Sequence, residues 1–456
     1  RTAVALSAGD SHTCAILDNG DMKCWGYDGN GQLGDGGSNT NANAPSSTAI
    51  DLGTGRTAVA ITGGLQHTCA ILDNGDVKCW GRDNIGQLGD GGTNTNTNAP
   101  SSTAIDLGTG RTAVAVHAGF SHTCAILDNG DMKCWGRDNY GQLGNGAILT
   151  DADAPSSTPI DLGTGRTAVA ASVGQHHTCA ILDNGDMKCW GHNNQGQLGN
   201  GGVGSVTSVV SPPSTPIDLG TGRTAVALSA GESHTCAILD NGDVKCWGYD
   251  SNGQLGDGGS NTNANAPSST AIDLGTGRTA VAITGGLQHT CAILDNGDVK
   301  CWGRDNIGQL GDGGTNTNTN APSSTAIDLG TGRTAVALSA GDEFTCAILD
   351  NGEMKCWGSD WAGQLGDGGS NTNQGSPVAV SGSNTWNSSP GVSNGSTGTG
   401  VTETFTFSLQ SLADFDGDGL ANDLPSDYDA AEGPTSGLVA DSDDDGDGLS
   451  DSVETD

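Results

Sequence analysis

The sequence predicts an all-β fold, a seven-bladed β-propeller of four-stranded antiparallel blades, with a segment of different character after it. Two observations lead to this prediction. The stretch HTCAILDNGDMKCWG at 12–26 returns six more times, at intervals of 55 residues with one of 57. A period of this length is typical of repeat architectures. Each repeat holds short β-type runs separated by Gly, Asn, Asp and Ser, and the apolar periodicity of a helix is absent from the sequence, which favours strands over helices.

A β-hairpin forms the centre of each repeat. In the first repeat the strands are 13–17 and 21–25, and Asp18-Asn19-Gly20 is the turn, because Asn and Gly accept a positive φ. A three-residue loop places Cys14 directly opposite Cys24 in a non-hydrogen-bonded pair, where Cα atoms approach most closely. The sequence therefore predicts one disulfide per hairpin: Cys14–Cys24, Cys69–Cys79, Cys124–Cys134, Cys179–Cys189, Cys236–Cys246, Cys291–Cys301 and Cys346–Cys356.

These pairs use all fourteen cysteines. Free thiols in a cytosolic protein are the alternative. A zinc site is disfavoured, because nine residues separate the cysteines of each pair and two thiolates do not make a four-ligand site. Disulfides persist in oxidising compartments. The chain is therefore predicted to be secreted, to an extracellular or cell-surface location.

The other elements of the first repeat follow in order. Residues 1–6 form strand A, and the hairpin supplies strands B and C. The loop Gly-Gln-Leu-Gly-Asp-Gly at 31–36 leads into a polar Asn/Thr run, and 47–52 form strand D. In the seventh repeat 377–380 take the place of strand D. Each strand type thus occurs seven times, which describes a propeller domain over 1–380 whose ring closes by blade-to-blade packing.

Three motifs of the repeat, Gly-x-x-His-Thr-x-Ala-Leu/Ile-Leu, Gly-x-x-x-x-Trp-Gly and Gly-Gln-Leu-Gly, resemble the regulator-of-chromosome-condensation repeat. The resemblance implies a seven-bladed propeller. The family's founding member binds chromatin and promotes nucleotide exchange on a small nuclear GTPase, but the resemblance does not carry that activity to an acidic, disulfide-bonded chain without a basic tail. The fold's other known roles are in protein–protein recognition, and fold alone does not select among them.

Charge and repetition exclude several functions. A net charge of −36 argues against nucleic acid or an anionic membrane as partner, and no apolar run is long enough for a transmembrane segment. Residues 1–110 and 223–332 differ at only three positions, whereas a catalytic site needs unlike residues from several blades. We therefore predict no enzyme and no catalytic residues. The His12-type and Trp25-type residues are interpreted as structural, bonding and packing between blades.

Differences between repeats gather in two places, just before the hairpin and just after Trp-Gly. In an up-and-down blade both places lie on the same face of the ring. Tyr, Trp and Arg are favoured in interfaces, so this face is the candidate binding surface, with drift in tolerant loops as the alternative. The candidate residues are Tyr27, Arg82, Phe120, Arg137, Tyr140, His176, His192, Tyr249, Arg304, Phe344 and Trp361.

The composition changes after the propeller. Residues 381–400 are a Gly/Ser/Thr linker. Residues 401–412 hold a single tethered strand whose apolar and polar residues alternate over 401–409. A lone strand must pair with a free sheet edge. It either docks on its own propeller or adds to a neighbouring subunit, which would build an assembly or filament.

The acidic tail over 413–456 carries the spacing of calcium loops. Asp443-x-Asp445-x-Asp447-Gly448-Leu449-x-Asp451-x-x-Glu454 places oxygen donors at the positions such loops use. A second set starts at Asp414 but lacks the final carboxylate. The tail is similar to thrombospondin type 3 repeats, and calcium is the predicted cofactor. The predicted ligands are Asp414, Asp416, Asp418, Asn422, Asp423, Asp443, Asp445, Asp447, Leu449, Asp451 and Glu454.

Together these features favour a non-catalytic extracellular propeller with a calcium-ordered tail. Its predicted role is structural or in protein interaction, as part of a cell-surface assembly or filament, and its predicted partner is a second copy or another surface protein. The alternative is a carbohydrate-binding, lectin-like propeller, for which a glycan would be the partner.

Overall fold

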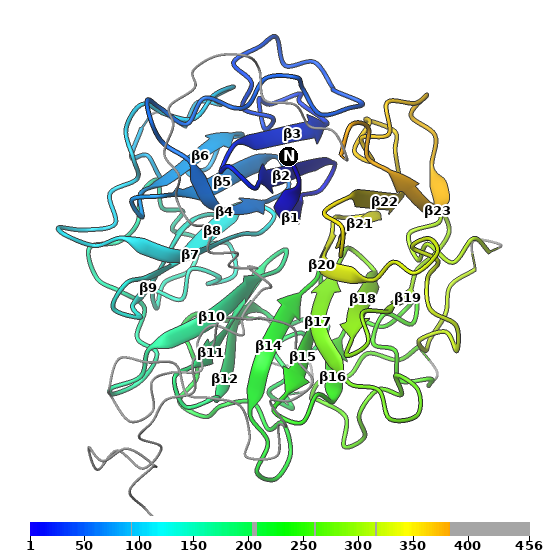
Figure 1. The fold of residues 1–456 in the computed structure, drawn as a ribbon. Coiled ribbons are helices and arrows are strands. Elements are labelled where there is room, and N and C mark those ends of the chain that lie inside the picture. The colour runs from blue at the N-terminus through cyan, green and yellow to red at the C-terminus, as the bar shows by residue number, and fades with distance from the viewer. Residues whose placement is uncertain (93, 203–207, 260, 315–316, 384–456) are drawn as a thin grey trace, which may run out of the picture. The chain divides into compact units, whose positions relative to one another are not determined.

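The computed structural model describes residues 1–383, apart from 93, 203–207, 260 and 315–316. The regular elements of these residues are all strands, and they form seven antiparallel sheets (Figure 1). Within the same residues there is no helix that could cross a membrane. The predicted linker from 384 on, the tethered strand and the calcium loops lie outside the described residues.

Each sheet is one blade, numbered here from 1 to 7 along the chain. The first strands are β1 Ala3–Ala8, β4 Ala58–Gly63, β7 Ala113–Ala118, β10 Ala168–Val173, β14 Ala225–Ala230, β17 Ala280–Gly285 and β20 Ala335–Ala340. The second strands are β2 His12–Leu17, β5 His67–Leu72, β8 His122–Leu127, β11 His177–Leu182, β15 His234–Leu239, β18 His289–Leu294 and β21 Phe344–Leu349. The third strands are β3 Met22–Gly26, β6 Val77–Gly81, β9 Met132–Gly136, β12 Met187–His192, β16 Val244–Gly248, β19 Val299–Gly303 and β22 Met354–Gly358. The strands lie within two residues of their predicted positions.

The fourth strand is the main difference from the prediction. Among the described residues two blades have one, β13 Ser208–Val209 and β23 Gln374–Ala379. In blade 1 the segment predicted as a strand at 47–52 contributes one backbone bond, from Ile50 N to Met22 O at 2.9 Å, and an isolated bridge joins Gly26 to Ala42. The polar run and Pro45 separate these two contacts, so no continuous ladder forms. In the part of the chain that the structure describes, the other five blades therefore have three strands each.

The hairpins are as predicted. Leu17 N donates to Asp21 O at 2.8 Å across the three-residue turn, and Gly20 has a φ of 78°. Cys14 pairs directly with Cys24 in the strand register. All seven predicted disulfides are present, with Cα atoms 4.0–4.1 Å apart, and no described cysteine is free.

One loop carbonyl joins each blade to the next. The carbonyl of Gln32 in the Gly-Gln-Leu-Gly loop of blade 1 accepts two hydrogen bonds from blade 2, from Thr68 Oγ1 at 2.8 Å and from Trp80 Nε1 at 3.0 Å. The same pair of bonds recurs at all seven interfaces, including the one where Gln364 of blade 7 accepts from Thr13 and Trp25 of blade 1. These Trp side chains are fully buried, which confirms their interpretation as packing between blades.

The repeated histidines are also structural. His12 Nε2 lies 2.8 Å from Thr68 Oγ1 of the next blade, and the equivalent contact occurs at six of the seven interfaces. The seventh interface has Phe344 instead of His. Phe344 was predicted to belong to the binding face, and this was wrong: its side chain is fully buried in the cluster that joins blades 7 and 1. It occupies the inward-facing position of a buried strand.

The hydrophobic core consists of seven clusters, each shared by two neighbouring blades. One cluster, for example, packs Cys14, Ile16 and Met22 of blade 1 against Leu72 and Trp80 of blade 2. The last cluster packs blade 7 against blade 1, and β1 contacts β20 and β21. The ring over residues 1–383 thus closes by blade-to-blade packing, as predicted, together with the hydrogen bonds from blade 1 to Gln364, and no strand is shared between the first and last blades.

Candidate interaction face

The two variable places of each repeat come together on one face of the ring. In every blade the residue after Trp-Gly donates its backbone N–H to the carbonyl of the residue just before the hairpin, at 2.8–2.9 Å. Tyr27 to Ser11 and Arg82 to Gln66 are two of these bonds. We call this side of the ring the variable face. The opposite end carries the uniform turns, where Arg–Asp pairs such as Arg56–Asp73 at 3.0 Å repeat in each blade.

Backbone bonds also connect neighbouring blades along this face. Asp10 N donates to Gly64 O of blade 2, and Leu65 N donates to Gly119 O of blade 3, at 3.1 and 3.2 Å. Glu232 N donates to Gly286 O, and Leu287 N to Asp342 O. The loops before the hairpins therefore follow one another at hydrogen-bonding distance, and side chains of successive blades are presented next to each other.

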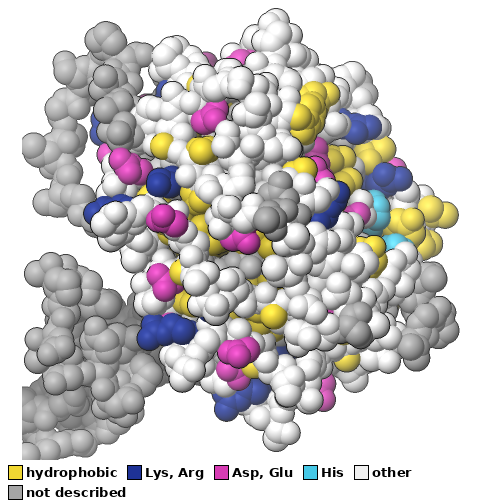
Figure 2. Space-filling model, turned by 90° about the vertical axis from the view of Figure 1, so that its right-hand side faces the viewer, with side chains coloured by type: hydrophobic (Ala, Val, Ile, Leu, Met, Phe, Trp, Pro, Cys, Tyr) yellow, Lys and Arg dark blue, Asp and Glu magenta, His cyan; other side chains and the backbone are white. Residues whose placement is uncertain are grey.

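Four of the predicted side chains form one group, which we call the aromatic–histidine cluster: Phe120, Tyr140, His176 and His192. The ring centroids of Tyr140 and His192 are 4.2 Å apart, and those of Tyr140 and His176 are 5.1 Å apart. Phe120 meets His176 at 6.3 Å in an edge-on arrangement. All four are partly exposed. Figure 2 shows histidine side chains beside hydrophobic and basic ones at one edge of the surface.

The loop that carries Tyr140 holds two residues that the sequence analysis missed. Ile148 and Leu149 are large, apolar and exposed, Leu149 to 73%. Leu149 N donates to Asp138 O at 2.8 Å, which closes the loop next to Tyr140. Only repeat 3 has Ala-Ile-Leu at 147–149, where repeat 1 has Gly-Ser-Asn at 37–39. Comparison of the loops after Gly-Gln-Leu-Gly would have revealed these residues.

A second aromatic contact lies where blades 7 and 1 meet. Tyr27 and Trp361 approach to 5.4 Å between ring centroids, and Trp361 is 56% exposed. Tyr249, the equivalent of Tyr27 in blade 5, is only partly exposed and has no such ring partner among the described residues. The structure thus divides the predicted aromatic residues between two separate places.

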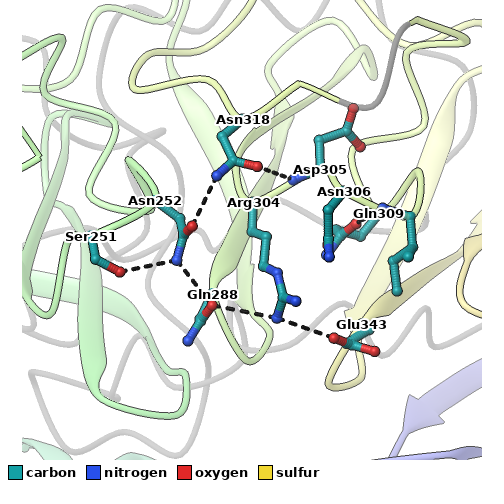
Figure 3. A network of polar contacts seen from close by, with 10 residues as sticks. Ser251, Asn252, Gln288, Arg304, Asp305, Asn306, Gln309, Asn318 and Glu343 are labelled. Carbon is teal, nitrogen blue, oxygen red and sulfur yellow. Dashed lines mark hydrogen bonds and ion pairs between the residues drawn. The ribbon is translucent and has the colours of Figure 1, made fainter.

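The predicted arginines differ in their partners. Arg304 of blade 6 forms an ion pair with Glu343 of blade 7 at 3.1 Å, and it also donates to Gln288 Oε1 at 3.4 Å (Figure 3). Its equivalent in blade 2, Arg82, donates to the neutral oxygens of Gln66 and Asn84 at 2.7 and 2.9 Å. Identical local sequences are thus placed beside different neighbours, because blade 3 offers Ser121 where blade 7 offers Glu343.

Acidic side chains gather on the other part of this face. Asp342 of blade 7 lies close to Asp10 of blade 1, Glu232 of blade 5 and Glu343. Burial, the hydrogen bond to Asp10 and the nearby carboxylates raise the pKa of Asp342 well above its usual range. On the side of the aromatic–histidine cluster, burial together with Arg137 and His192 lowers the pKa of His176 to about 4. The positive charge there comes from arginine.

The described residues contain no group of three or more His, Cys, Asp or Glu side chains that could hold a metal ion. The predicted calcium ligands all lie outside the described residues, at 414–423 and 443–454. The prediction of calcium therefore continues to depend on the spacing of the oxygen donors.

Family models identify the repeats. The RCC1-like domain model matches residues 1–281, more than half of the chain. Models of the regulator of chromosome condensation (RCC1) repeat match 280–309, 335–364 and 296–348. The chain belongs to the RCC1-like repeat family. The resemblance seen in the repeat motifs is thereby confirmed, as is the seven-bladed propeller that it implied.

Individual relatives agree with this assignment. The ultraviolet-B receptor UVR8 of Arabidopsis thaliana is 31% identical over 378 residues, which cover 81% of this chain and 79% of UVR8. The mitochondrial RCC1 domain-containing protein RUG3 of the same plant is 29% identical and covers 73% of this chain and 72% of its own length. A chain in the crystal structure of Kap60 bound to yeast RCC1 (Prp20) has a TM-score of 0.67 at 21% identity, covering 79% of this chain and 83% of its own, which shows the shared fold.

Proposed function

We propose that this protein is a non-catalytic, extracellular or cell-surface interaction protein that binds a protein partner through its variable face. The observation that carries the proposal is the distribution of differences between repeats. Seven nearly identical blades differ mainly on one face, and there they present partly exposed arginine and aromatic side chains. Aromatic side chains are favoured at interfaces because they bury large areas with few rotatable bonds, and arginine is favoured because its planar guanidinium donates several hydrogen bonds in a fixed geometry.

Two further observations support the proposal. The seven disulfides fit a protein of an oxidising compartment. Yeast RCC1 is described in the structure named above as bound to Kap60, which is consistent with protein recognition by a propeller of this kind. The lectin-like alternative gains no support from the relatives named above, none of which is described as a lectin.

The acidic tail extends the proposal. We infer that calcium binds at 443–454 and orders the tail, and that the strand at 401–409 pairs with a sheet edge. If that edge belongs to a second copy, the protein builds an assembly.

Two experiments test this function. Light scattering of the full chain with calcium and then with a chelator should show assembly that depends on calcium and is lost on deletion of 401–456; a monomer under both conditions would contradict the assembly role. An alanine scan of Phe120, Tyr140 and Trp361, with affinity capture from extracellular material and quantitative binding of the captured protein, should weaken binding. Unchanged binding in all three variants would contradict the role of the variable face.

A further inference from the structure

The arginines without an acidic partner among the described residues lie on two adjacent blades of this acidic chain. The chain has ten arginines, and eight of them form ion pairs with Asp or Glu. Six of the seven lysines are buried in the hairpins. Arg82 and Arg137 are the two arginines for which the described residues provide no acidic partner. Both are partly exposed. Arg82 donates to the neutral amides of Gln66 and Asn84, and Arg137 faces the amide of Asn139, which accepts from it when the amide oxygen is turned toward the guanidinium.

These two arginines flank the aromatic–histidine cluster. Arg137 belongs to the same loop as Tyr140, and its charge acts on His176. Arg82 lies in the preceding blade, whose Leu65 N donates to Gly119 O at 3.2 Å, immediately before Phe120. Two unneutralised cations on adjacent blades thus border one group of aromatic rings, and this combination attracts carboxylates together with an aromatic or apolar side chain.

Leu149 presents an exposed apolar side chain although its backbone conformation is unfavourable for leucine. Its φ is 61°, a left-handed conformation that costs a large side chain free energy. Asn39, Asn94, Asn261 and Asn371 adopt φ values of 53–54°, and Asn39 stands at the equivalent place of repeat 1. Asn tolerates this conformation, whereas Leu149 adopts it and leaves its side chain 73% exposed. Folding alone does not account for leucine at this position, whereas contact with a partner does.

We propose that Arg82, Phe120, Arg137, Tyr140, Leu149 and His176, here called the blade 2–4 sector, form a docking site for an acidic protein segment that carries an aromatic or large apolar side chain. The proposal rests on the interaction function above and names the chemistry of the partner. Carboxylates of the segment pair with the two arginines, and its apolar side chain packs against Tyr140 and Leu149.

The test uses the full chain and a labelled synthetic peptide of Asp and Glu around a central Phe. We expect saturable binding that weakens with salt. Arg82→Ala, Arg137→Ala and Leu149→Asn should each reduce affinity about three- to tenfold, by roughly 1 kcal/mol. Arg304→Ala is the matched control, because its local sequence is that of Arg82 but its charge is already neutralised by Glu343; it should leave affinity unchanged. Leu149→Asn should not lower the Tm, which separates binding from folding.

Several results would overturn the proposal. These are equal binding of a peptide with Lys in place of Asp and Glu, equal loss with Arg304→Ala, or no binding of the acidic peptide. Light scattering could instead show a dimer that dissociates in the Arg82→Ala variant and does not bind the acidic peptide. This result would show that a second copy of the chain occupies the sector. If Trp361→Ala abolishes peptide binding and the sector variants do not, the peptide binds elsewhere on the variable face. The proposed docking site is then wrong, while the interaction function of the variable face stands.

Discussion

At the scale of single residues, a buried carboxylate recurs after Trp-Gly in six of the seven repeats. Asp28 Oδ1 accepts the backbone N–H of Leu33 at 3.0 Å, which shapes the Gly-Gln-Leu-Gly loop, while Oδ2 is buried without a partner. In blade 4 Asn193 takes this place and accepts from Leu198 N at the same distance. The position therefore requires a hydrogen-bond acceptor, and at Asp28 the second carboxylate oxygen adds no further bond.

The electrostatic consequence can be measured. Burial raises the pKa of Asp28 to about 6. An acid with a raised pKa in the folded state contributes stability below the unfolded pKa near 4, and that contribution is lost as the pH rises through about 6. Asp28→Asn removes this titration. The variant should gain about 1–3 kcal/mol relative to the wild type between pH 4 and pH 7, as measured by urea denaturation at each pH.

Asp51→Asn, which removes an exposed carboxylate, is the control for the loss of one negative charge. A constant difference for Asp28→Asn would show that the buried carboxylate does not titrate in this range. Comparing variants with the wild type is essential, because the buried histidines have lowered pKa values and act on the pH dependence in the opposite direction.

At the scale of elements, the loop and the hairpin of each repeat have separate roles. The loop packs on the next blade: a Cβ at Gly34 would meet Trp80 Nε1, whereas a Cβ at Gly36 would have no neighbour within 4 Å. Both glycines have φ values near 70°. The two positions thus share a positive φ but differ in the space available to a Cβ.

Alanine at these two glycines should separate strain from packing. Gly36→Ala should cost about 1 kcal/mol, the usual cost of the left-handed conformation. Gly34→Ala should cost about 2 kcal/mol more, because Trp80 must move in a close-packed interface. Chemical denaturation of the two variants measures the difference, and equal losses would show that Trp80 can shift freely.

The disulfide is the corresponding feature of the hairpin. Replacing Cys124 and Cys134 by serine should lower the free energy of unfolding by about 2–3 kcal/mol, because the cross-link restricts only a short loop of the unfolded chain. The fold should stay intact. Strand pairing and six other disulfides remain. Denaturation with and without reductant checks this, and the wild type should lose more than the variant when reduced. Unfolding of the variant without denaturant would contradict it.

At the scale of the whole ring, the interface between blades 7 and 1 differs from the other six. The chain does not run from blade 7 into blade 1, and Phe344 replaces the histidine that bonds to threonine elsewhere. Closure there depends on the buried cluster of Leu6, Trp25 and Phe344 with their neighbours. It is therefore the place where local opening requires no strain in a linking loop.

Phe344→Ala should weaken this closure. The expected cost is about 3–5 kcal/mol, the usual range for a buried aromatic side chain. Hydrogen exchange should rise first in β1 and β20–β22. Trp135→Ala at a chain-connected interface should lose similar stability without selective exchange in those strands. Uniform exchange in the Phe344 variant would show that the ring opens as one cooperative unit.

Much of this architecture could be predicted from local sequence. The alternation around Asp18-Asn19-Gly20 set the register of the hairpin, and that register placed Cys14 opposite Cys24. The sequence predicts a fourth strand in every blade, but the described residues of five blades form none, because a ladder depends on backbone partners that the Asn/Thr run does not supply in register. Phe344 differs from the His of the other repeats, and this difference led to its prediction as a surface residue. Its place in the strand directs the side chain inward instead.

The number of blades, the disulfide pairing and the side of the ring on which variation collects can all be predicted from the amino-acid pattern, because they follow from a repeated period and from turn chemistry within a few residues. Which arginines are neutralised depends instead on contacts between blades. Arg82 and Arg304 have the same neighbours along the chain, but Glu343 of the next blade reaches Arg304 alone. Charge pairing acts through space, so two copies of one sequence acquire different chemistry from the blades beside them.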